Sequence, residues 1–253
     1  MGEKLRVTLV CNAGVLLEYR GTTLLLDGIF GGEEHPFSDL SPEVWQQMLQ
    51  GEGAFSKVDY LLFSHRHPDH FSPERTLQYL QKQPVKGIFR PESDSCGELE
   101  AYLIQHRIPC VLLSQQTDYA AFCVEPHITV RAFTTQHLDK KYQDVRHVCY
   151  LLSFDDKYIL FTADVDYLSA AFDIVQNIPL RGVFLNPLFF RVLRNPRFFH
   201  GSLKAEAYCV YHVPFAEDDA LRLRQMVRRD LQNWPEDEGP AMALTEPWQT
   251  IEF

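Results

Sequence analysis

The chain has 253 residues, 45% of them apolar and 13% aromatic, which is enough to bury a substantial core. Its formal net charge of −10 at pH 7 lacks the diffuse positive field of a general nucleic-acid binder, so we expect no nucleic-acid partner. The sequence has no apolar stretch of the ~20 residues that span a membrane and no extended apolar leader, so we expect a cytoplasmic protein without a membrane partner.

The N-terminal quarter of the chain predicts short strands followed by an insertion. Strands are expected over 5–11, 14–19 and 22–27, which are β-rich and separated by turn signals. Residues 31–57 differ, with glycines near both ends and a helix expected near 41–49. This segment is either a lid over a functional site or an ordinary surface insertion. The apolar run 58–64 then predicts another strand.

A six-residue motif follows that strand: His65-Arg66-His67-Pro68-Asp69-His70, which reads H-x-H-x-D-H. Imidazoles and carboxylates are ligands for transition metals. Side chains two apart in an extended chain leave on the same side, so His65 and His67 can hold one ion while Asp69 and His70 reach a second. The alternative is a solvated histidine-rich loop or an adventitious metal site.

The elements after the motif alternate between helices and strands. Ser72-Pro73-Glu74 supplies an N-cap, a proline at the first helical position and an acidic first turn, which predicts a helix through about Leu80. Further strands are expected at 87–89, 109–113, 182–185 and 242–253, a hairpin turn at 155–157, and helices at 97–106, 166–177 and 216–233. The sequence shows no linker and no internal repeat.

The cysteines predict no disulfide framework. The six are scattered without a C-x-x-C pair, and most fall in apolar runs, so we expect buried, reduced side chains. They are Cys11, Cys96, Cys110, Cys123, Cys149 and Cys209.

The H-x-H-x-D-H motif after a strand resembles that of the metallo-β-lactamase-fold hydrolases, whose other ligands come singly from the ends of later strands. This chain offers a candidate at each such place: His137 after 128–135, Asp164 after 158–163 and His212 after 207–211. Asp27, after 22–26, matches the buried N-terminal aspartate of that superfamily. The resemblance extends from about Leu5 to His212.

The resemblance implies a ligand set for two metal ions. It puts His65, His67 and His137 on one ion, Asp69, His70 and His212 on the second, and Asp164 between both. Asp27 would orient the ligand loop without touching metal. Other interpretations remain open: His137 and His212 as structural histidines, Asp166 in place of Asp164, and Asp27-Gly28 as a plain turn.

The resemblance also implies a fold and a subgroup. The expected fold is α+β, a four-layer αβ/βα sandwich with two mixed sheets flanked by helices, in a single domain over residues 1–253 with an insertion at about 31–57. Phe71-Ser72-Pro73 replaces the small or glycine-rich stretch of glyoxalase-type members. Asp164 stands where zinc β-lactamases commonly use cysteine, and His67 where flavodiiron proteins have glutamate. The chain is therefore most similar to the ascorbate-6-phosphate lactonases and uncharacterised metal-dependent hydrolases.

The function implied is that of a dinuclear hydrolase in which a metal-bridging hydroxide cleaves a small ester, lactone or phosphodiester. The cofactors would be two divalent ions, zinc foremost, with manganese and iron accepted by the same donors. Asp69 and Asp164 would be the catalytic carboxylates, Asp69 as a proton shuttle. The alternatives are an oxidative enzyme of the same fold with a single iron, a non-catalytic metal-stabilised interaction module, and a nuclease.

Candidate substrate contacts are fewer and weaker. Arg191, Arg194 and Arg197 form a basic island flanked by phenylalanines, and a spacing of three puts them on one helical face, although Pro196 opposes a continuous helix. They would hold the phosphate or carboxylate of a small anionic substrate, or else form a solvated, acid-paired surface. His147 and His200 are further candidate contacts. Homo-oligomerisation is left open.

Overall fold

Two compact units make up the chain in a computed structural model, which describes residues 3–32, 34–92, 96–113, 119–168, 170–193 and 203–253. Unit 1 comprises residues 1–115 and 246–252, and unit 2 comprises residues 116–245 and 253. The single domain predicted over 1–253, with its insertion, stays a prediction.

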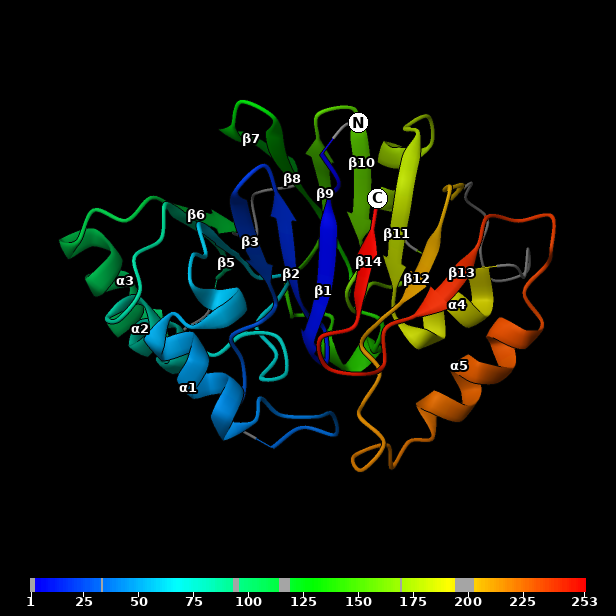
Figure 1. Ribbon diagram of the computed structural model, residues 1–253, viewed down its shortest axis with the longest axis horizontal. Helices are drawn as coiled ribbons and strands as arrows, with labels where there is room; N and C mark the ends of the chain where they lie inside the picture. The colour runs from blue at the N-terminus through cyan, green and yellow to red at the C-terminus, as the bar shows by residue number, and fades with distance from the viewer. Residues whose placement is uncertain (1–2, 33, 93–95, 114–118, 169, 194–202) are drawn as a thin grey trace. The chain divides into compact units, whose positions relative to one another are not determined.

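Unit 1 is built on a mixed seven-stranded sheet in the order β14-β1-β2-β3-β4-β5-β6 (Figure 1). Its strands are β1 (Arg6–Cys11), β2 (Gly14–Tyr19), β3 (Thr22–Leu26), β4 (Tyr60–Leu62), β5 (Gly87–Pro91), β6 (Cys110–Leu113) and β14 (Thr250–Glu252). The first three pair antiparallel through tight turns, where Asn12 and Arg20 take left-handed φ values of 52° and 48°. From β3 to β6 all neighbours are parallel, so these strands end at one edge of the sheet.

The helices of unit 1 begin where local sequence signals place them. They are α1 (Pro42–Gln50), α2 (Pro73–Leu80) and α3 (Gly97–Gln105), with a 3₁₀ turn η1 (Gly53–Phe55). Ser41 Oγ accepts the N–H of Val44 at 3.2 Å, and Ser72 Oγ accepts that of Arg75 at 3.3 Å. Each serine precedes a proline at the first helical position, so the predicted helix starts agree with the structure to about one residue. Among the described residues, no helix is long and apolar enough to cross a membrane.

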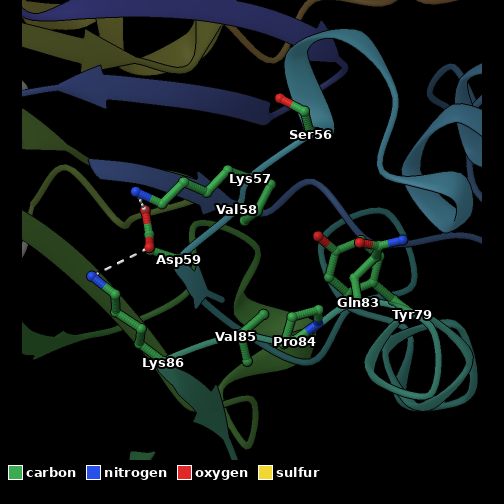
Figure 2. A pocket seen from close by; sticks show the side chains of 9 residues that line it. All are labelled: Ser56, Lys57, Val58, Asp59, Tyr79, Gln83, Pro84, Val85 and Lys86. Atoms are coloured by element: carbon green, nitrogen blue, oxygen red, sulfur yellow. Dashed lines mark ion pairs between the residues drawn. The ribbon is translucent and has the colours of Figure 1, made fainter. Parts of the chain in front are cut away.

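A buried aspartate joins three strands at the opposite edge of the unit 1 sheet. The Asp59 carboxylate accepts the Thr23 N–H at 3.0 Å and pairs with Lys57 Nζ at 3.7 Å and Lys86 Nζ at 3.3 Å. Figure 2 shows both lysines reaching this carboxylate beside a cavity of about 270 Å³ that Tyr79 also lines. These contacts tie the starts of β3, β4 and β5 together, because Thr23, Asp59 and Lys86 lie at or next to the first residues of those strands.

Unit 2 holds a second mixed seven-stranded sheet, in the order β13-β12-β11-β10-β9-β8-β7. Its strands are β7 (Tyr119–Glu125), β8 (Ile128–Thr135), β9 (His147–Phe154), β10 (Lys157–Phe161), β11 (Leu180–Leu185), β12 (Tyr208–Val210) and β13 (Ala241–Ala243). Its helical segments are α4 (Pro187–Leu193), α5 (Leu223–Gln232) and the 3₁₀ turns η3 (Lys140–Tyr142) and η4 (Ala170–Val175). The chain runs antiparallel from β7 to β10 and parallel from β10 to β13.

The core of unit 2 packs α4 and α5 against this sheet. Phe189 and Phe190 of α4 and Val227 of α5 are buried in one cluster with Leu160 and Val183 of the sheet. Figure 1 shows α5 alongside β13 and α4. Burying each such side chain stabilises the fold by about 1.5–3 kcal/mol.

Three predicted elements differ from the structure. The helix predicted at 216–233 begins only at Leu223, because Arg222 has a left-handed φ of 57° and the Asp219 carboxylate accepts the N–H groups of Leu223 and Arg224. Within the described part of 166–177, only η4 is helical. The strand predicted at 242–253 is two strands, β13 and β14, which pair in different sheets on either side of a turn at Trp248 with a φ of 65°.

Four of the six cysteines are buried, as predicted, whereas Cys110 and Cys123 are exposed. All six lie in described segments, and no disulfide joins any of them. Burial raises the pKa of the Cys149 and Cys209 thiols, so both stay neutral at physiological pH.

We predict that Gly14→Ala lowers the free energy of unfolding by about 1–3 kcal/mol because the site is overpacked. A Cβ at Gly14 would lie 2.9 Å from Gly28 Cα and 3.1 Å from the Asp27 carbonyl oxygen. At Gly97, the first residue of α3, a Cβ would meet nothing within 4 Å. Gly97→Ala should therefore be neutral or stabilise by about 0.4–1 kcal/mol. Urea denaturation measures both, and equal effects would contradict the prediction.

Candidate metal centre

The H-x-H-x-D-H motif lies in unit 1, in the loop between β4 and α2. β3 and β4 are parallel, so Asp27, one residue beyond β3, and His65, three residues beyond β4, leave the same edge of the sheet. Ligands in open sheets with parallel strands bind at this carboxyl edge. The motif therefore occupies the position that the strand-to-helix prediction gave it.

Backbone hydrogen bonds hold this loop in one conformation. The Gly31 N–H donates to the Pro68 carbonyl at 2.7 Å, and the N–H groups of His70 and Phe71 both donate to the His67 carbonyl at 2.9 Å. The buried side chain of Asn12, in the β1–β2 turn, donates to the Asp69 carbonyl at 3.0 Å. The loop is thus fixed from within and from two neighbouring turns.

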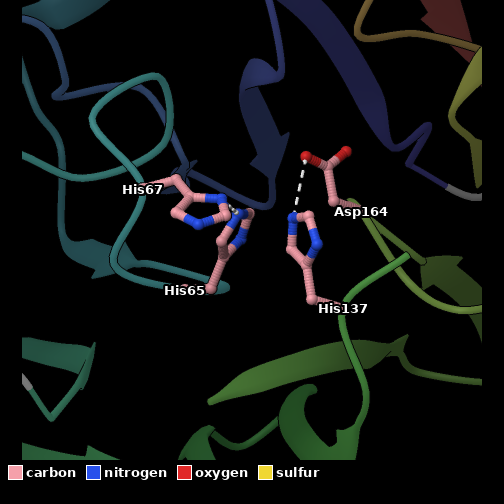
Figure 3. Close-up of side chains that lie close together, drawn as sticks. All are labelled: His65, His67, His137 and Asp164. Atoms are coloured by element: carbon pink, nitrogen blue, oxygen red, sulfur yellow. Dashed lines mark hydrogen bonds and ion pairs between the residues drawn. The ribbon is translucent and has the colours of Figure 1, made fainter. Parts of the chain in front are cut away.

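Four side chains of the motif, which we call the unit 1 ligand set, lie in two pairs whose potential metal-binding atoms are close together. They are His65, His67, Asp69 and His70. His65 Nε2 and His67 Nδ1 are 3.1 Å apart, and Figure 3 shows these two nitrogens facing each other. His70 Nε2 lies 3.5 Å from Asp69 Oδ2. His65 and His70 are fully buried, so their rings are held rather than solvated.

Asp27 supports the loop from beneath. It is 0% exposed, and its Oδ1 accepts the Ser64 N–H at 2.7 Å. Its Oδ2 accepts the Ser64 hydroxyl at 2.6 Å and lies 2.9 Å from His70 Nδ1. Asp27 thus contacts the loop through Ser64 and His70. Its predicted role of orienting metal ligands stays a prediction.

The three later candidates, which we call the unit 2 ligand set, follow alternate strands of the second sheet. His137, Asp164 and His212 come two or three residues after β8, β10 and β12. β8 runs antiparallel to β9, which runs antiparallel to β10, and β10 to β12 are parallel. All three strands therefore end at the same edge of the sheet, which brings the three side chains together.

Asp164 faces a histidine with each of its carboxylate oxygens. Its Oδ2 lies 3.6 Å from His137 Nε2, as Figure 3 shows, and its Oδ1 lies 3.2 Å from His212 Nε2. Two hydrogen bonds between 136–138 and 164–166, from Leu138 N to Asp164 O and from Asp166 N to Gln136 O, both at 2.7 Å, set this arrangement. The Asp166 side chain accepts the Leu168 N–H instead, and the choice of Asp164 as the ligand stays a prediction.

The peptide before Asp164 is clamped from both sides. Ala163 has a left-handed φ of 43°, a conformation that costs a non-glycine residue about 1–3 kcal/mol. The Tyr211 hydroxyl oxygen accepts the Ala163 N–H at 2.9 Å, and Asn186 Nδ2 donates to the Ala163 carbonyl at 2.8 Å. These two buried side chains hold Asp164 in its orientation.

A backbone contact bears on the tautomer of His137. Its Nδ1 accepts the Asp139 N–H at 3.0 Å, which keeps the proton of a neutral ring on Nε2. Ligation of an ion through Nε2 would therefore cost this proton or this hydrogen bond. Asp139 Oδ1 in turn accepts the Lys141 N–H at 3.0 Å, and this hydrogen bond lowers the pKa of the Asp139 carboxyl.

The donor spacing in each set fits a transition metal. Two nitrogens on one tetrahedral zinc are about 3.3 Å apart when each Zn–N bond is 2.0–2.1 Å. The pairs within the unit 1 ligand set are 3.1 and 3.5 Å apart, and those within the unit 2 ligand set 3.2 and 3.6 Å. His and Asp side chains of both sets belong to groups that could hold a metal ion. The residues present therefore suit divalent ions.

The structure describes only two of the weaker candidates. His147 is fully buried, with its Nδ1 2.5 Å from Thr135 Oγ1, and its ring lies 6.2 Å from that of His137. Arg191 is exposed on α4, whereas Arg194, Arg197 and His200 lie outside the described residues. The substrate contacts predicted for all of them stay predictions. Gly31 and Gly32, at the start of the insertion, line a cavity of about 330 Å³ with Arg66 of the motif loop, and the lid hypothesis also stays open.

Sequence reasoning missed the residues that position the ligands. Asn12, Ser64, Asn186 and Tyr211 hold the ligand loops through hydrogen bonds to backbone or side chains. Ser64 had one available signal, since it directly precedes the motif and a hydroxyl there can reach a neighbouring ring. The others contact residues 23–57 positions away, so no local pattern marks them.

Comparisons with known proteins find structural similarity over nearly the whole chain and sequence similarity over a small part of it. No family model matches the chain. A protein of Mycolicibacterium smegmatis that carries the name Rieske 2Fe-2S iron-sulfur protein is 36% identical over 85 residues, which is 32% of this chain and 15% of that protein. The match therefore covers a small part of either chain.

Three solved structures resemble nearly the whole chain, each at a TM-score of 0.60. Igni18, a metallo hydrolase from Ignicoccus hospitalis, is 14% identical and matches 99% of this chain and 98% of its own. YhfI from Bacillus subtilis, a metallo-β-lactamase fold protein, is 13% identical and matches 99% and 100%. CmlA, a diiron β-hydroxylase from Streptomyces venezuelae, is 17% identical, and this chain spans about half of it (54%). At these identities the likeness is one of fold.

We predict that Asn186→Ala lowers both the free energy of unfolding and the affinity for zinc. It would leave the buried Ala163 carbonyl without the amide donor and remove the cap that Asn186 Oδ1 provides to the Phe189 N–H. The expected loss in free energy of unfolding is about 1–3 kcal/mol. Urea denaturation and zinc titration measure the two effects. The control is Asn233→Ala on an exposed helix end, which should change neither; equal effects of the two variants would contradict the prediction.

Proposed function

We propose that this chain, which has the metallo-β-lactamase fold, is a dinuclear metal-dependent hydrolase that cleaves a small ester, lactone or phosphodiester. The fold agrees with the predicted α+β class, since two mixed seven-stranded sheets are formed with helices α1–α5 among the described residues. The narrower resemblance to the ascorbate-6-phosphate lactonases stays a prediction.

The observation that carries the proposal is the placement of Asp164. Its two carboxylate oxygens face the Nε2 atoms of two different histidines, which supports a bridging role between two cations. We propose that His65, His67 and His137 bind one ion, that Asp69, His70 and His212 bind the other, and that Asp164 bridges them. The spacing inside each ligand set supports this assignment, as does the metallo hydrolase Igni18 among the structural neighbours.

The donor types also bear on which metal would bind. Neutral imidazoles and carboxylates without thiolate ligands accept zinc, manganese and iron, so the ligands do not select one of them. We propose zinc as the first candidate, as the sequence resemblance implied. The number of ions is part of the proposal.

The reaction we propose needs no side-chain nucleophile. Two divalent ions held by these residues would supply Lewis acidity and would lower the pKa of a coordinated water from 15.7 to about 7. We propose that Asp69, whose Oδ2 lies 3.5 Å from His70 Nε2, holds a proton for transfer to the leaving group, as the sequence resemblance implied. Cys149 and Cys209 are buried neutral thiols and so are unsuited to nucleophilic attack.

An oxidative iron enzyme is the second candidate. CmlA, a diiron β-hydroxylase, resembles this chain at the same TM-score as the metallo hydrolase, and the His/Asp donors accept iron. The metal content distinguishes the two candidates, as it does the third alternative of a non-catalytic metal-stabilised module.

We predict that protein purified without added metal or chelator contains about two zinc or manganese ions per chain. Elemental mass spectrometry measures this, and removal of the ions by a chelator should lower Tm because metal binding adds to folding free energy. Iron as the main metal would favour oxidative chemistry. A well-folded, metal-free protein that does not reload would contradict the metal site altogether.

We predict that Asp164→Ala lowers hydrolytic activity more than about 100-fold and reduces the metal content, since a direct ligand should cost more than an orienting residue does. Asp69→Ala should lower kcat by a similar factor. The readout is turnover of a panel of phosphodiesters, lactones and esters. Asp166→Ala is the matched control, two residues from Asp164 and turned to the Leu168 N–H, and should keep activity within a few-fold. Full activity in Asp164→Ala with metal retained would refute the assignment.

A further inference from the structure

We infer that Ser64 is a positioning residue whose hydroxyl links the Asp27 carboxylate to His65 through hydrogen bonds, an arrangement that we call the relay. Asp27 would then determine which ring nitrogen carries the proton in two candidate ligand histidines. It contacts His70 directly and His65 through the Ser64 hydroxyl. The inference rests on the proposed function for its consequence, metal ligation by these rings. The hydrogen bonds themselves stand without it.

The relay is a short chain of buried contacts within unit 1. The Ser64 hydroxyl donates to Asp27 Oδ2 at 2.6 Å, and the same oxygen lies 2.9 Å from His65 Nδ1. His70 Nδ1 lies 2.9 Å from Asp27 Oδ2. Asp27, His65 and His70 are 0% exposed and Ser64 is 2% exposed, so surface water does not compete for these groups.

Counting protons along this chain gives the state of each ring. An ionised carboxylate only accepts hydrogen bonds, so the single hydroxyl proton of Ser64 goes to Asp27. The Ser64 oxygen can then only accept, which requires a proton on His65 Nδ1. His70 Nδ1 faces the same carboxylate and carries its proton for the same reason. In both neutral rings the lone pair is therefore on Nε2.

Two contacts that would favour other arrangements of the protons are longer. Asp69 Oδ2 would favour a proton on His70 Nε2, but it lies at 3.5 Å against 2.9 Å for Asp27. The Ser64 hydroxyl is 3.4 Å from His70 Nδ1, beyond a good hydrogen bond, so it serves His65. His67 Nδ1 lies 3.1 Å from His65 Nε2, a contact that is compatible with a lone pair on His65 Nε2. Distance thus favours Nδ1 protonation in both rings.

His137 provides an internal contrast. Its Nδ1 accepts the Asp139 N–H at 3.0 Å, so its neutral ring carries the proton on Nε2. His65 and His70 are thus preset to offer Nε2 to a cation, as metal-binding histidines usually are when a carboxylate orients them, and His137 is not. Opposite tautomers in one protein make the inference measurable.

The first test is the tautomer of each ring in the full-length chain, stripped of metal, by ¹⁵N-resolved NMR of the imidazoles at a pH where they are neutral. We expect Nδ1–H for His65 and His70 and Nε2–H for His137. In Ser64→Ala, His65 should lose its single tautomer while His70 keeps its own, and Ser64→Thr, which retains a hydroxyl, should restore His65. An Nε2–H form of His65 in the unsubstituted protein, or a His65 spectrum unchanged by Ser64→Ala, would overturn the inference.

The second test is zinc affinity by competition with a chromophoric chelator. Loss of an orienting hydrogen bond should weaken binding by about 10–100-fold in Ser64→Ala, with Ser64→Thr close to the unsubstituted protein. Ser153→Ala, another buried serine in β9 that accepts from Arg131, is the control and should leave affinity unchanged. Equal affinity in Ser64→Ala would overturn the role toward metal.

The two tests separate this inference from the proposed function. If the unsubstituted protein binds no metal, the proposed function fails while the tautomers still support or refute the relay. If metal binds and the tautomers are not those given above, the relay fails and the proposed function stands.

Discussion

The buried carboxylate of Asp27 is the constraint on which the motif loop depends. An ionised carboxylate removed from water costs several kcal/mol unless donors satisfy it. The donors to Asp27 come from Ser64 and His70, at the start and end of one loop. If the loop moved away, the buried Asp27 carboxylate would lose these hydrogen-bond donors, and without the loop the carboxylate could not be buried. Strand β3, which delivers Asp27, and the loop after β4 stabilise each other.

In unit 2, the direction of the strands determines where the candidate ligands lie. Each of its three candidate ligands follows a strand that ends at the same sheet edge, so topology alone gathers residues that are 27 and 48 positions apart. Side chains then refine what topology provides. Asn186 and Tyr211 fix the peptide before Asp164, and so each carboxylate oxygen has its own histidine. Coarse placement comes from the sheet, and orientation comes from buried polar side chains.

Elements with local signals could be predicted from sequence, and elements decided by distant contacts could not. Helix α2 was placed to the residue because Ser72 and Pro73 define its start within the helix itself. The start of α5 was predicted too early, because an Asp219 carboxylate that caps two N–H groups is not distinguishable in sequence from a charged helical face. The final strand was divided because its two halves pair with β1 and β12, which lie far apart in the chain.

The positions of the candidate ligands after strand ends could be predicted for a related reason. A metal site needs particular side chains at strand ends, and an apolar run that stops at a histidine or aspartate is visible in sequence. Their supporting residues are not, since Asn12 touches Asp69 only because two turns, 57 positions apart, meet in the folded unit. No pattern near Asn12 distinguishes it from any other turn asparagine.

The left-handed backbone at Ala163 has a consequence for how this protein can change. Glycine adopts that conformation without the strain that alanine bears, so a sequence selected for thermal resistance alone would favour glycine there. Glycine would also widen the range of directions in which the next carboxylate can point. Laboratory evolution toward heat resistance would thus make the orientation of the Asp164 carboxylate less precise. In a homologous sequence, the residue at position 163 would indicate whether selection favoured stability or the orientation of this carboxylate.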